Sequence, residues 1–444
     1  MTPGAASALQ IQEQVLATQG RAGPVRIALI AVAGLAAAVG GWCWSLQIRY
    51  GMGLTGLNRP VAWATYITDF VFWVGIAHSG TLLSAILFLF RARFRTAVYR
   101  VAEAMTVFAV LTAGLFPVIH LGRPWFAYWL FPYPNQRQLW INFRSPLVWD
   151  VFAVSTYFIV SSLFLLLGII PDAASLRDVT RGWRRRLNGL LAARWRGTAE
   201  EWRHYDRVYL LLAAFATPLV VSVHSVVSWD FAMSIVPGWH STLFPPYFVA
   251  GAILSGVAMV IFLLIPLRRA LKVESLITNH HLDMLSRLLL LTSLIVTYSY
   301  LTELWLAWRA GPGPEQSSFR NRVFGALAPL FWTMVTCNSL LPLSLFLRRV
   351  RQSPAVLWGL SLLVILGMWL ERFVIIVSSL SHDYLPFDWR GYRPTLVEVG
   401  VTAGSFGWFF FWFLLFITFL PGVSIAETKA EAVFEHQAEA PHAA

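Results

Sequence analysis

Cysteine is nearly absent from this sequence, and charged residues are scarce. Only Cys43 and Cys337 occur among 444 residues, far apart and inside apolar segments. Their separation excludes CxxC metal sites, CxxCH haem attachment and a disulfide framework, so we expect no metal site or covalently bound cofactor in the chain. Charged residues make up 13% of the sequence, against about a quarter in soluble domains. The composition therefore excludes a soluble globular protein.

Acidic residues are fewer than basic ones, 22 against 34, which gives a formal net charge of +12. On a soluble domain, such a surplus would suggest nucleic acid as the partner. Here the arginines cluster between long apolar runs, and the chain is 57% hydrophobic. We therefore interpret the arginines as topology signals and expect no nucleic-acid partner.

Apolar runs of the length that crosses about 30 Å of hydrocarbon occur ten times. The sequence thus predicts an all-α integral membrane protein of about ten transmembrane helices. About 25 polar residues precede the first run, which we expect to be a retained anchor rather than a cleaved signal peptide. The approximate predicted spans are 26–46, 67–90, 102–120, 147–170, 208–229, 246–267, 285–307, 326–347, 355–379 and 397–420.

The distribution of Lys and Arg predicts the orientation. Ten spans put both termini on one side, and the segments on that side carry 23 Lys and Arg, against 10 on the other. The positive-inside rule then places both termini in the cytoplasm. The richest loop, 171–207, includes Arg184, Arg185 and Arg186 and suits either an amphipathic surface helix or a topology signal lying against anionic lipid.

The order of the spans suggests a parallel repeat. Spans two to five and spans six to nine are predicted to form two four-helix bundles of the same orientation, with the first and last spans flanking them. The predicted segments are the cytoplasmic N-terminal segment 1–25, the first span and outer loop 26–66, the bundles 67–229 and 230–379, the last span 397–420 and a cytoplasmic tail 421–444.

The outer loop 121–146 is rich in Trp, Tyr, Phe and Pro. Its aromatic side chains suit either the headgroup level of the membrane or a binding surface. Irregular backbone at membrane depth is tolerated only where protein covers it or a cavity hydrates it. We therefore expect a partner or a pocket at this loop.

His120 and Asp150 are the leading candidate site. His120 ends the third span and Asp150 opens the fourth, so both should lie near the outer surface on adjacent antiparallel helices. A histidine can take a proton from a hydroxyl group, and a neighbouring carboxylate can fix its tautomer and stabilise the imidazolium. The alternative is a structural contact that holds the aromatic loop in place.

Other ionisable groups lie inside the predicted spans, where each is costly and thus a functional candidate. Together they would suit a chain of proton-exchanging groups with bridging waters, although each alone could be a structural contact. The proton-path candidates are Asp69, His78, His224, Asp230, Tyr298, Glu303 and Arg372.

The loop and its flanks carry the motifs His120-Leu-Gly-Arg-Pro124, Tyr128-Trp-Leu-Phe-Pro-Tyr-Pro134 and Asn142-Phe-Arg-Ser-Pro-Leu-Val-Trp-Asp150. As a set they resemble the NrfD/polysulfide-reductase membrane-subunit family. Within that family, the ten spans and the stretches Ile76-Ala-His-Ser-Gly80 and Val296-Thr-Tyr-Ser-Tyr-Leu-Thr-Glu303 resemble bacterial alternative complex III, which contains two ten-span membrane subunits of similar architecture. The intact pair of His120 and Asp150 favours the quinol-oxidising one of the two.

This resemblance implies a quinol-oxidising subunit without a redox cofactor of its own. It implies that menaquinol or ubiquinol binds at His120 and Asp150, with Arg123, Trp125 and Arg144 contacting the pocket or a partner. The implied partners are a periplasmic iron–sulfur subunit on the outer loops, a second NrfD-like membrane subunit, multihaem cytochrome c subunits and lipid. Iron–sulfur clusters and haems are expected only in those partners, and proton translocation through the two bundles is a further implication.

Two other functions remain open from the sequence. His78 and His224 could face one another in a b-haem membrane anchor, although no single span carries two histidines. The intramembrane acids and the possible repeat would also suit a secondary transporter. Such a transporter should have helices broken at matching places in both halves, and Pro218 does not match Pro329 and Pro342 in that way.

Overall fold

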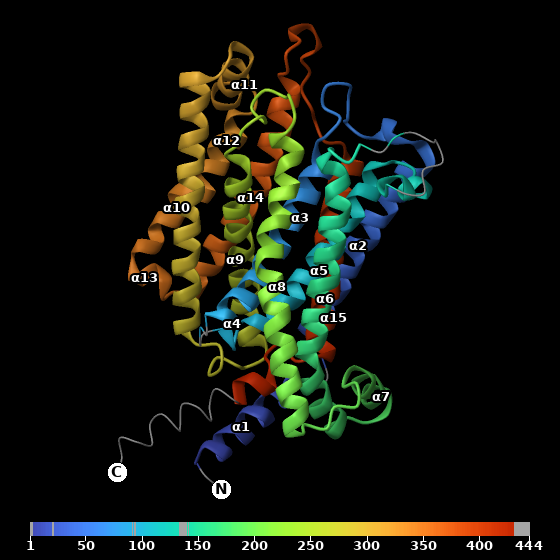
Figure 1. Cartoon of the computed structure of the whole chain (residues 1–444), viewed down its shortest axis with the longest axis vertical. Coiled ribbons are helices and arrows are strands. Elements are labelled where there is room, and N and C mark those ends of the chain that lie inside the picture. Colours follow the sequence, from blue (N-terminus) through green and yellow to red (C-terminus); the bar gives the residue numbers. More distant parts are fainter. Residues whose placement is uncertain are drawn as a thin grey trace.

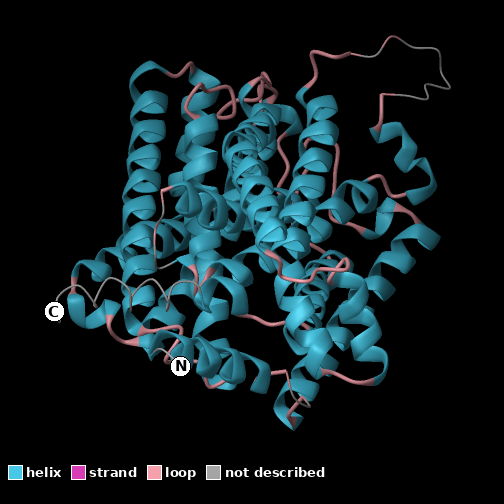
Figure 2. Cartoon of the chain, turned by 60° about the horizontal axis from the view of Figure 1, so that its bottom comes forward, coloured by secondary structure: helices cyan, strands magenta, loops and turns pink. Residues whose placement is uncertain are grey.

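The structure, a computed structural model, describes residues 3–19, 22–90, 92, 95–132, 140 and 142–429. Within those ranges the chain is helical and contains no strand, and ten helices are long and apolar enough to cross a membrane. The predicted fold class is therefore confirmed (Figure 2).

Eight of the ten spans are single helices, and two are composite helices that contain a π-helical turn. The single helices are α2 (Pro24–Tyr50), α5 (Tyr99–His120), α6 (Pro146–Val179), α8 (Ala199–Ala232), α9 (Phe244–Ala270), α10 (Asn279–Ala310), α14 (Pro354–Ser381) and α15 (Leu396–Phe419). The composite spans are α3 (Thr65–Thr81) with η2 (Leu82–Ile86) and α4 (Leu87–Leu89), and α12 (Ala328–Val335) with η5 (Thr336–Leu340) and η6 (Leu341–Phe346).

Shorter helices lie at the two ends of the spans. They are α1 (Pro3–Ala17), η1 (Met52–Leu54), η4 (Pro124–Leu130), α7 (Gly182–Leu191), α11 (Gly313–Phe324), α13 (Arg348–Arg351) and η7 (Pro386–Asp388). In Figure 1, α1, α7 and the last described residues lie at one end, called the inner end here, and α11 lies at the opposite, outer end. The start and finish of the described chain thus share one end, as an even number of spans requires; a cytoplasmic location for that end stays a prediction.

The spans group into two bundles, with the first and last spans beside them. The helices α3, α5, α6 and α8 pack together as a first bundle, and α9, α10, α12 and α14 pack as a second. The two bundles meet where α3 packs against α9. These two helices are the most enclosed spans, because 83% of an apolar 18-residue stretch of each is buried. The first and last spans, α2 and α15, pack along each other (Figure 1).

The pairing of α2 with α15 depends on close backbone approach. A Cβ atom at Gly404 would collide with the Cα atom of Gly40, so only glycine fits there. Small residues allow membrane helices to approach closely because van der Waals packing, rather than water exclusion, holds helices together in lipid. Most of α2 is nevertheless exposed on the surface of the chain, since only 11% of its apolar 18-residue stretch is buried.

The basic loop 171–207 is more helical than expected. The spans α6 and α8 continue beyond the predicted ends, to Val179 and from Ala199, and the predicted amphipathic helix is α7 between them. Arg184 of α7 donates hydrogen bonds to the backbone oxygens of Gln19 (2.9 Å) and Thr418 (3.0 Å). The arginine therefore holds α7 against the inner end of the molecule.

The predicted C-terminal tail begins as a packed segment. Asp172 Oδ1 accepts a hydrogen bond from the backbone N–H of Ile425 at 3.0 Å, and Glu427 forms an ion pair with Arg95. Burial raises the pKa of the Glu427 carboxyl, and the charge of Arg95 opposes that rise. Residues 421–429 thus close the inner end of the first bundle, and 430–444 lie outside the described residues.

Candidate functional site

The C-terminal end of α5 places His120 at the outer end of the first bundle. The chain leaves α5 through Gly122, whose φ of +71° lies in the left-handed region that favours glycine. A Cβ at Gly122 would also lie 2.7 Å from Met52 Cγ. The turn that leads from α5 into the aromatic loop therefore depends on this glycine.

Gln47 of α2 fixes the end of α5. Its fully buried amide donates a hydrogen bond to the carbonyl of Ile119 (2.8 Å) and accepts one from the hydroxyl of Tyr66 (2.6 Å). One side chain thus ties α2, α3 and α5 together beside His120. The backbone that carries the histidine is consequently held rigidly.

Asp150 meets Asp230. Asp150 lies in the first turns of α6 and Asp230 near the end of α8, and the two carboxyl groups interact directly. The Oδ1 atom of each is buried and has no hydrogen-bond partner among the described residues. Two ionised carboxylates in contact repel each other, so such a pair is suited to holding and releasing a proton.

No hydrogen bond joins His120 to Asp150 among the described residues. The Nδ1 atom of His120 is buried and has no hydrogen-bond partner in the part of the chain that the structure describes. The carboxylate of Asp150 is turned toward α8 and Asp230, which the sequence assigned to a proton path. The structure therefore brings the two acids together and leaves the histidine with an unsatisfied nitrogen at the same end of the bundle.

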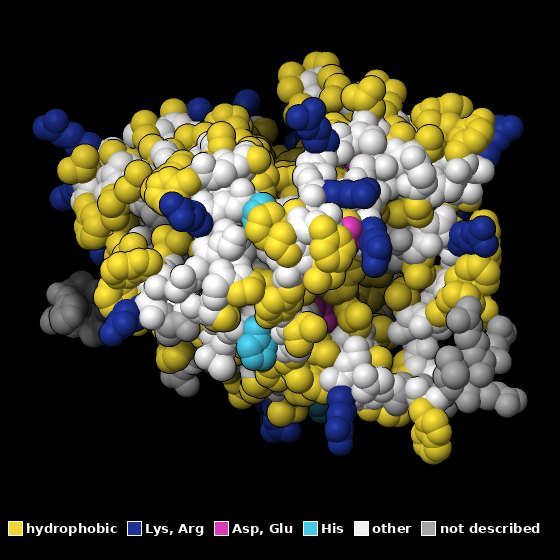
Figure 3. All heavy atoms as spheres, turned by 90° about the horizontal axis from the view of Figure 1, so that it is seen from above, with side chains coloured by type: hydrophobic (Ala, Val, Ile, Leu, Met, Phe, Trp, Pro, Cys, Tyr) yellow, Lys and Arg dark blue, Asp and Glu magenta, His cyan; other side chains and the backbone are white. Residues whose placement is uncertain are grey.

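The predicted partner-contact residues lie at the surface. Arg123 and Arg144 are exposed, and Trp125 in η4 is 58% exposed. Figure 3 shows hydrophobic side chains gathered on this outer face, with basic side chains between them. Residues 133–139 and 141 of the aromatic loop, which include part of the motif beginning at Tyr128, lie outside the described residues.

His78 and His224 face one another in the centre of the first bundle. Their ring centroids are 4.8 Å apart, and His78 Nε2 meets the backbone oxygen of Val220. A b-haem between them would need its iron, bonded to one nitrogen of each ring, and its flat macrocycle to fit in the space between the two rings. The pair is too close for that, so these histidines do not fit a haem site.

The second bundle contains a connected polar cluster. The Tyr300 hydroxyl donates to Glu371, and Asn338 Nδ2 donates to the same hydroxyl at 2.9 Å. Arg372 forms an ion pair with Glu371 at 2.6 Å. The π-helical turn η5 includes Asn338, and such turns commonly occur at functional sites. The sequence analysis did not select Asn338; a buried amide inside a span was the available signal.

Phe248 lies between this cluster and the histidine pair. The Arg372 guanidinium lies 4.3 Å from the centroid of the Phe248 ring, and the centroid of the His224 ring lies 6.0 Å from it. Both ring nitrogens of His224 are buried without a hydrogen-bond partner among the described residues. Polar groups of the two bundles, His224 and Arg372, therefore approach each other where the bundles meet, with Phe248 between them.

The remaining proton-path candidates have separate positions. Glu303 forms an ion pair with Arg322 at 3.0 Å near the outer end of α10. Asp69 accepts hydrogen bonds from Trp369 (2.7 Å) and Thr402 (2.6 Å), which connects α3 to α14 and α15.

Tyr298 lies outside the polar cluster. It is 66% exposed on the outer surface of α10, whereas Tyr300, two residues later, is 5% exposed. Tyr300, rather than Tyr298, is therefore the buried tyrosine in this part of α10.

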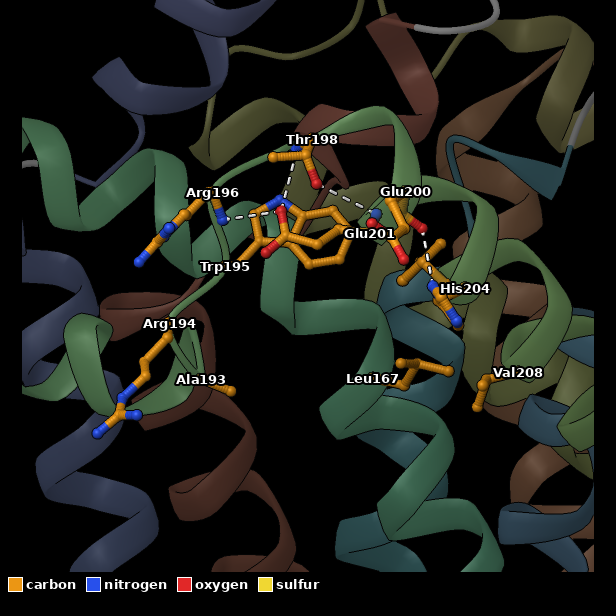
Figure 4. A pocket seen from close by; sticks show the side chains of 11 residues that line it. Leu167, Ala193, Arg194, Trp195, Arg196, Thr198, Glu200, Glu201, His204 and Val208 are labelled. Atoms are coloured by element: carbon orange, nitrogen blue, oxygen red, sulfur yellow. Dashed lines mark hydrogen bonds between the residues drawn. The ribbon is translucent and has the colours of Figure 1, made fainter.

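One surface cavity is distant from these groups. A cavity of about 650 Å³ lies at the inner loop between α7 and α8, where Arg194, Arg196 and His204 line it (Figure 4). The hydrogen bonds among its lining residues cap the N-terminus of α8, where Thr198 and Glu201 form a reciprocal capping box.

The described residues contain no group of three or more His, Cys, Asp or Glu that could hold a metal ion.

Comparison with known proteins defines the family. Residues 53–382 match the family described as polysulphide reductase, NrfD, so the chain belongs to this family of membrane subunits. It is therefore a multi-pass integral membrane protein, and its ten candidate spans agree with that assignment.

Three relatives cover half of the chain or more. A putative dimethyl sulfoxide reductase membrane subunit of Halobacterium salinarum is 28% identical, and the match covers 87% of this chain and 88% of the relative. A selenate reductase subunit of Mesobacillus selenatarsenatis is 22% identical, with 82% and 87% covered. An Hdr-like menaquinol oxidoreductase integral membrane subunit of Archaeoglobus fulgidus is 21% identical, with 53% and 49% covered.

Proposed function

We propose that this chain is the quinol-binding and quinol-oxidising membrane subunit of a multisubunit oxidoreductase. The observation that carries the proposal is the set of buried, unsatisfied acid and base groups at the outer end of the first bundle: His120, Asp150 and Asp230. The NrfD family membership and a relative named as a menaquinol oxidoreductase subunit support a quinol as the substrate. Menaquinol is the form that this relative's name favours.

The proposed chemistry needs two proton acceptors and an electron acceptor. Oxidation of a quinol breaks two O–H bonds and yields a quinone, two protons and two electrons. His120 Nδ1 accepts one proton, and the Asp150–Asp230 pair accepts the other, because each presents an atom without a hydrogen-bond partner among the described residues. The electrons leave to an iron–sulfur partner subunit that docks on the exposed aromatic loop.

The complex proposed for this chain is alternative complex III, in the position of its quinol-oxidising ten-span subunit. The loop motifs and the ten spans support that assignment. The expected partners are a periplasmic iron–sulfur subunit, a second NrfD-like membrane subunit and multihaem cytochrome c subunits, in a bacterial inner membrane with both termini cytoplasmic.

A reductase complex is the second candidate, favoured by the names of the Halobacterium and Mesobacillus relatives. Quinol oxidation is the same in both candidates, and only the electron acceptor differs. Purification of the native complex distinguishes them, since multihaem cytochrome subunits should co-purify in the first case and a terminal reductase subunit in the second.

We also propose that electron flow is coupled to proton movement. The polar groups that approach each other at the bundle interface, among them His224 and Arg372, support a proton path. Asp69, His78, Glu303 and Tyr300 are its further proposed members, and Tyr300 replaces Tyr298 because of its burial.

The test compares site variants with matched controls in the purified complex. We expect His120→Ala and Asp150→Asn to lower quinol oxidation about 100-fold or more, the usual contribution of a general base. The controls His204→Ala and Asp178→Asn change exposed residues at the inner end and should keep full activity. Wild-type activity in both site variants, with all subunits and haems present, would exclude the proposed site.

A further inference from the structure

An apolar groove opens at the inner half of the α2–α15 pair. It has a volume of about 770 Å³ and lies between α2, α9 and α15, with Trp358 of α14 at its side. Its wall is formed by apolar side chains and glycines, and among the described residues Arg26 is the single charged one that lines it. The groove is therefore amphipathic, with one cationic position and a long apolar remainder.

Arg26 lies at the inner mouth of this groove, in the first turn of α2. Its side chain is partly exposed, but its Nη1 atom is buried and has no hydrogen-bond partner among the described residues. A buried guanidinium nitrogen without an acceptor is costly, since it has lost its water and gained nothing in return. An anionic group on a ligand would remove that cost.

The start of α2 beside Arg26 lacks a side-chain cap. Gly23 is the N-cap residue of α2 and lines the groove, and it provides no side-chain hydrogen bond to the first turn. The N–H groups and dipole of a helix N-terminus attract anions. Two independent features, the unpaired guanidinium nitrogen and the uncapped helix start, thus favour an anion at the same place.

The length of the groove indicates what is attached to that anion. The lining residues of α2 run from Gly23 to Ala36, which is about 20 Å at the rise of an α-helix. Half of the hydrocarbon core of a bilayer is about 15 Å thick. The groove thus covers one leaflet from the headgroup level to the middle, which is the space of one acyl chain.

We propose that this groove binds a glycerophospholipid of the inner-end leaflet, with its phosphate on Arg26 and one acyl chain along α2 and α15. A quinone has a comparable chain but no anionic group for the arginine. A free phosphate ion would leave the apolar length empty. The bound lipid fills the gap beside α2 and stabilises its pairing with α15.

The experiment uses the full chain, purified in detergent and washed free of lipid. It is titrated with dioleoyl phosphatidylglycerol that carries a diazirine midway along one acyl chain, and binding is read by native mass spectrometry and mapped cross-links. We expect one tightly bound lipid, with cross-links between Leu29 and Ala36 and on the facing part of α15.

Two variants and one control decide the result. Arg26→Gln should lower lipid occupancy about tenfold or more, as expected for the loss of a charge-assisted hydrogen bond. Arg49→Gln removes an exposed arginine at the outer end of the same helix and should leave occupancy unchanged. Leu29→Trp keeps the charge but fills the groove, and should also reduce the cross-links.

Three outcomes would overturn the proposal. Equal lipid occupancy in Arg26→Gln and Arg49→Gln would show that the arginine does not hold the phosphate. Cross-links confined to other surfaces would show that the chain lies elsewhere. Cross-links from the groove to a second protein chain in the native complex would show that a subunit covers this face.

Discussion

The indole rings of Trp149 and Trp229 meet edge to face, with centroids 5.7 Å apart and planes at 80°. Each tryptophan directly precedes one member of the carboxyl pair, Asp150 on α6 and Asp230 on α8. Trp149 also donates a hydrogen bond to the carbonyl of Phe143 at 2.6 Å. One aromatic contact thus links the outer loop to the two helices and holds the acids together at the end of the first bundle.

The carboxyl pair should act as one unit in quinol oxidation. We expect Asp150→Asn and Asp230→Asn each to lower the rate strongly, and the double variant to be no worse than either single one by more than about twofold, because groups that act together are not additive. The measurement is quinol oxidation by the purified complex. If the fold-loss of rate in the double variant equals the product of the two single fold-losses, the two acids act independently.

Tyr300 and Tyr298 provide a matched pair on one helix. Tyr300→Phe removes the hydroxyl that binds Glu371 and Asn338, and should lower the free energy of unfolding by about 1–3 kcal/mol. Tyr298→Phe changes an exposed side chain and should alter it by about 0.5 kcal/mol or less. Unfolding in mixed micelles measures both. Equal changes in the free energy of unfolding for the two variants would show that the Tyr300 hydroxyl does not stabilise the polar cluster.

Gly404 and Gly41 test the contact between α2 and α15. Gly404→Ala places a Cβ against the backbone of Gly40, so it should lower the free energy of unfolding by about 1–3 kcal/mol. Gly41 has nothing within 4 Å of its Cβ position, and Gly41→Ala should leave stability unchanged or raise it by about 1 kcal/mol or less. Unfolding in mixed micelles again provides the measurement. A Gly404→Ala protein of undiminished stability would show that the helices can separate without cost.

Proton movement should be separable from electron flow. Asp69→Asn and Glu303→Gln lie away from the carboxyl pair, so we expect them to reduce proton displacement per electron more than the rate of quinol oxidation. Proteoliposomes with an internal pH probe measure both quantities. Glu200→Gln, an exposed change at the inner end, is the control. Equal losses of both quantities in the two site variants would count against a separate proton path.

The sequence by itself determined the number of spans and the family. Spans are readable because the hydrocarbon thickness demands about 20 apolar residues in a row, which is a local property of the chain. The positions of His120 and Asp150 near one end of their helices follow from the same span boundaries. The motifs that resemble the family all lie within residues 53–382, which match NrfD.

Only the tertiary structure decided which side chains meet. In lipid, the outward and inward faces of a helix are both apolar, so hydrophobic periodicity does not show how the helix is rotated. Tyr298 and Tyr300 differ by about 200° around the helix, and packing alone gives Tyr300 the interior. Likewise, Asp230 meets Asp150 because α6 packs along α8, a contact between segments distant in the sequence that no local pattern encodes.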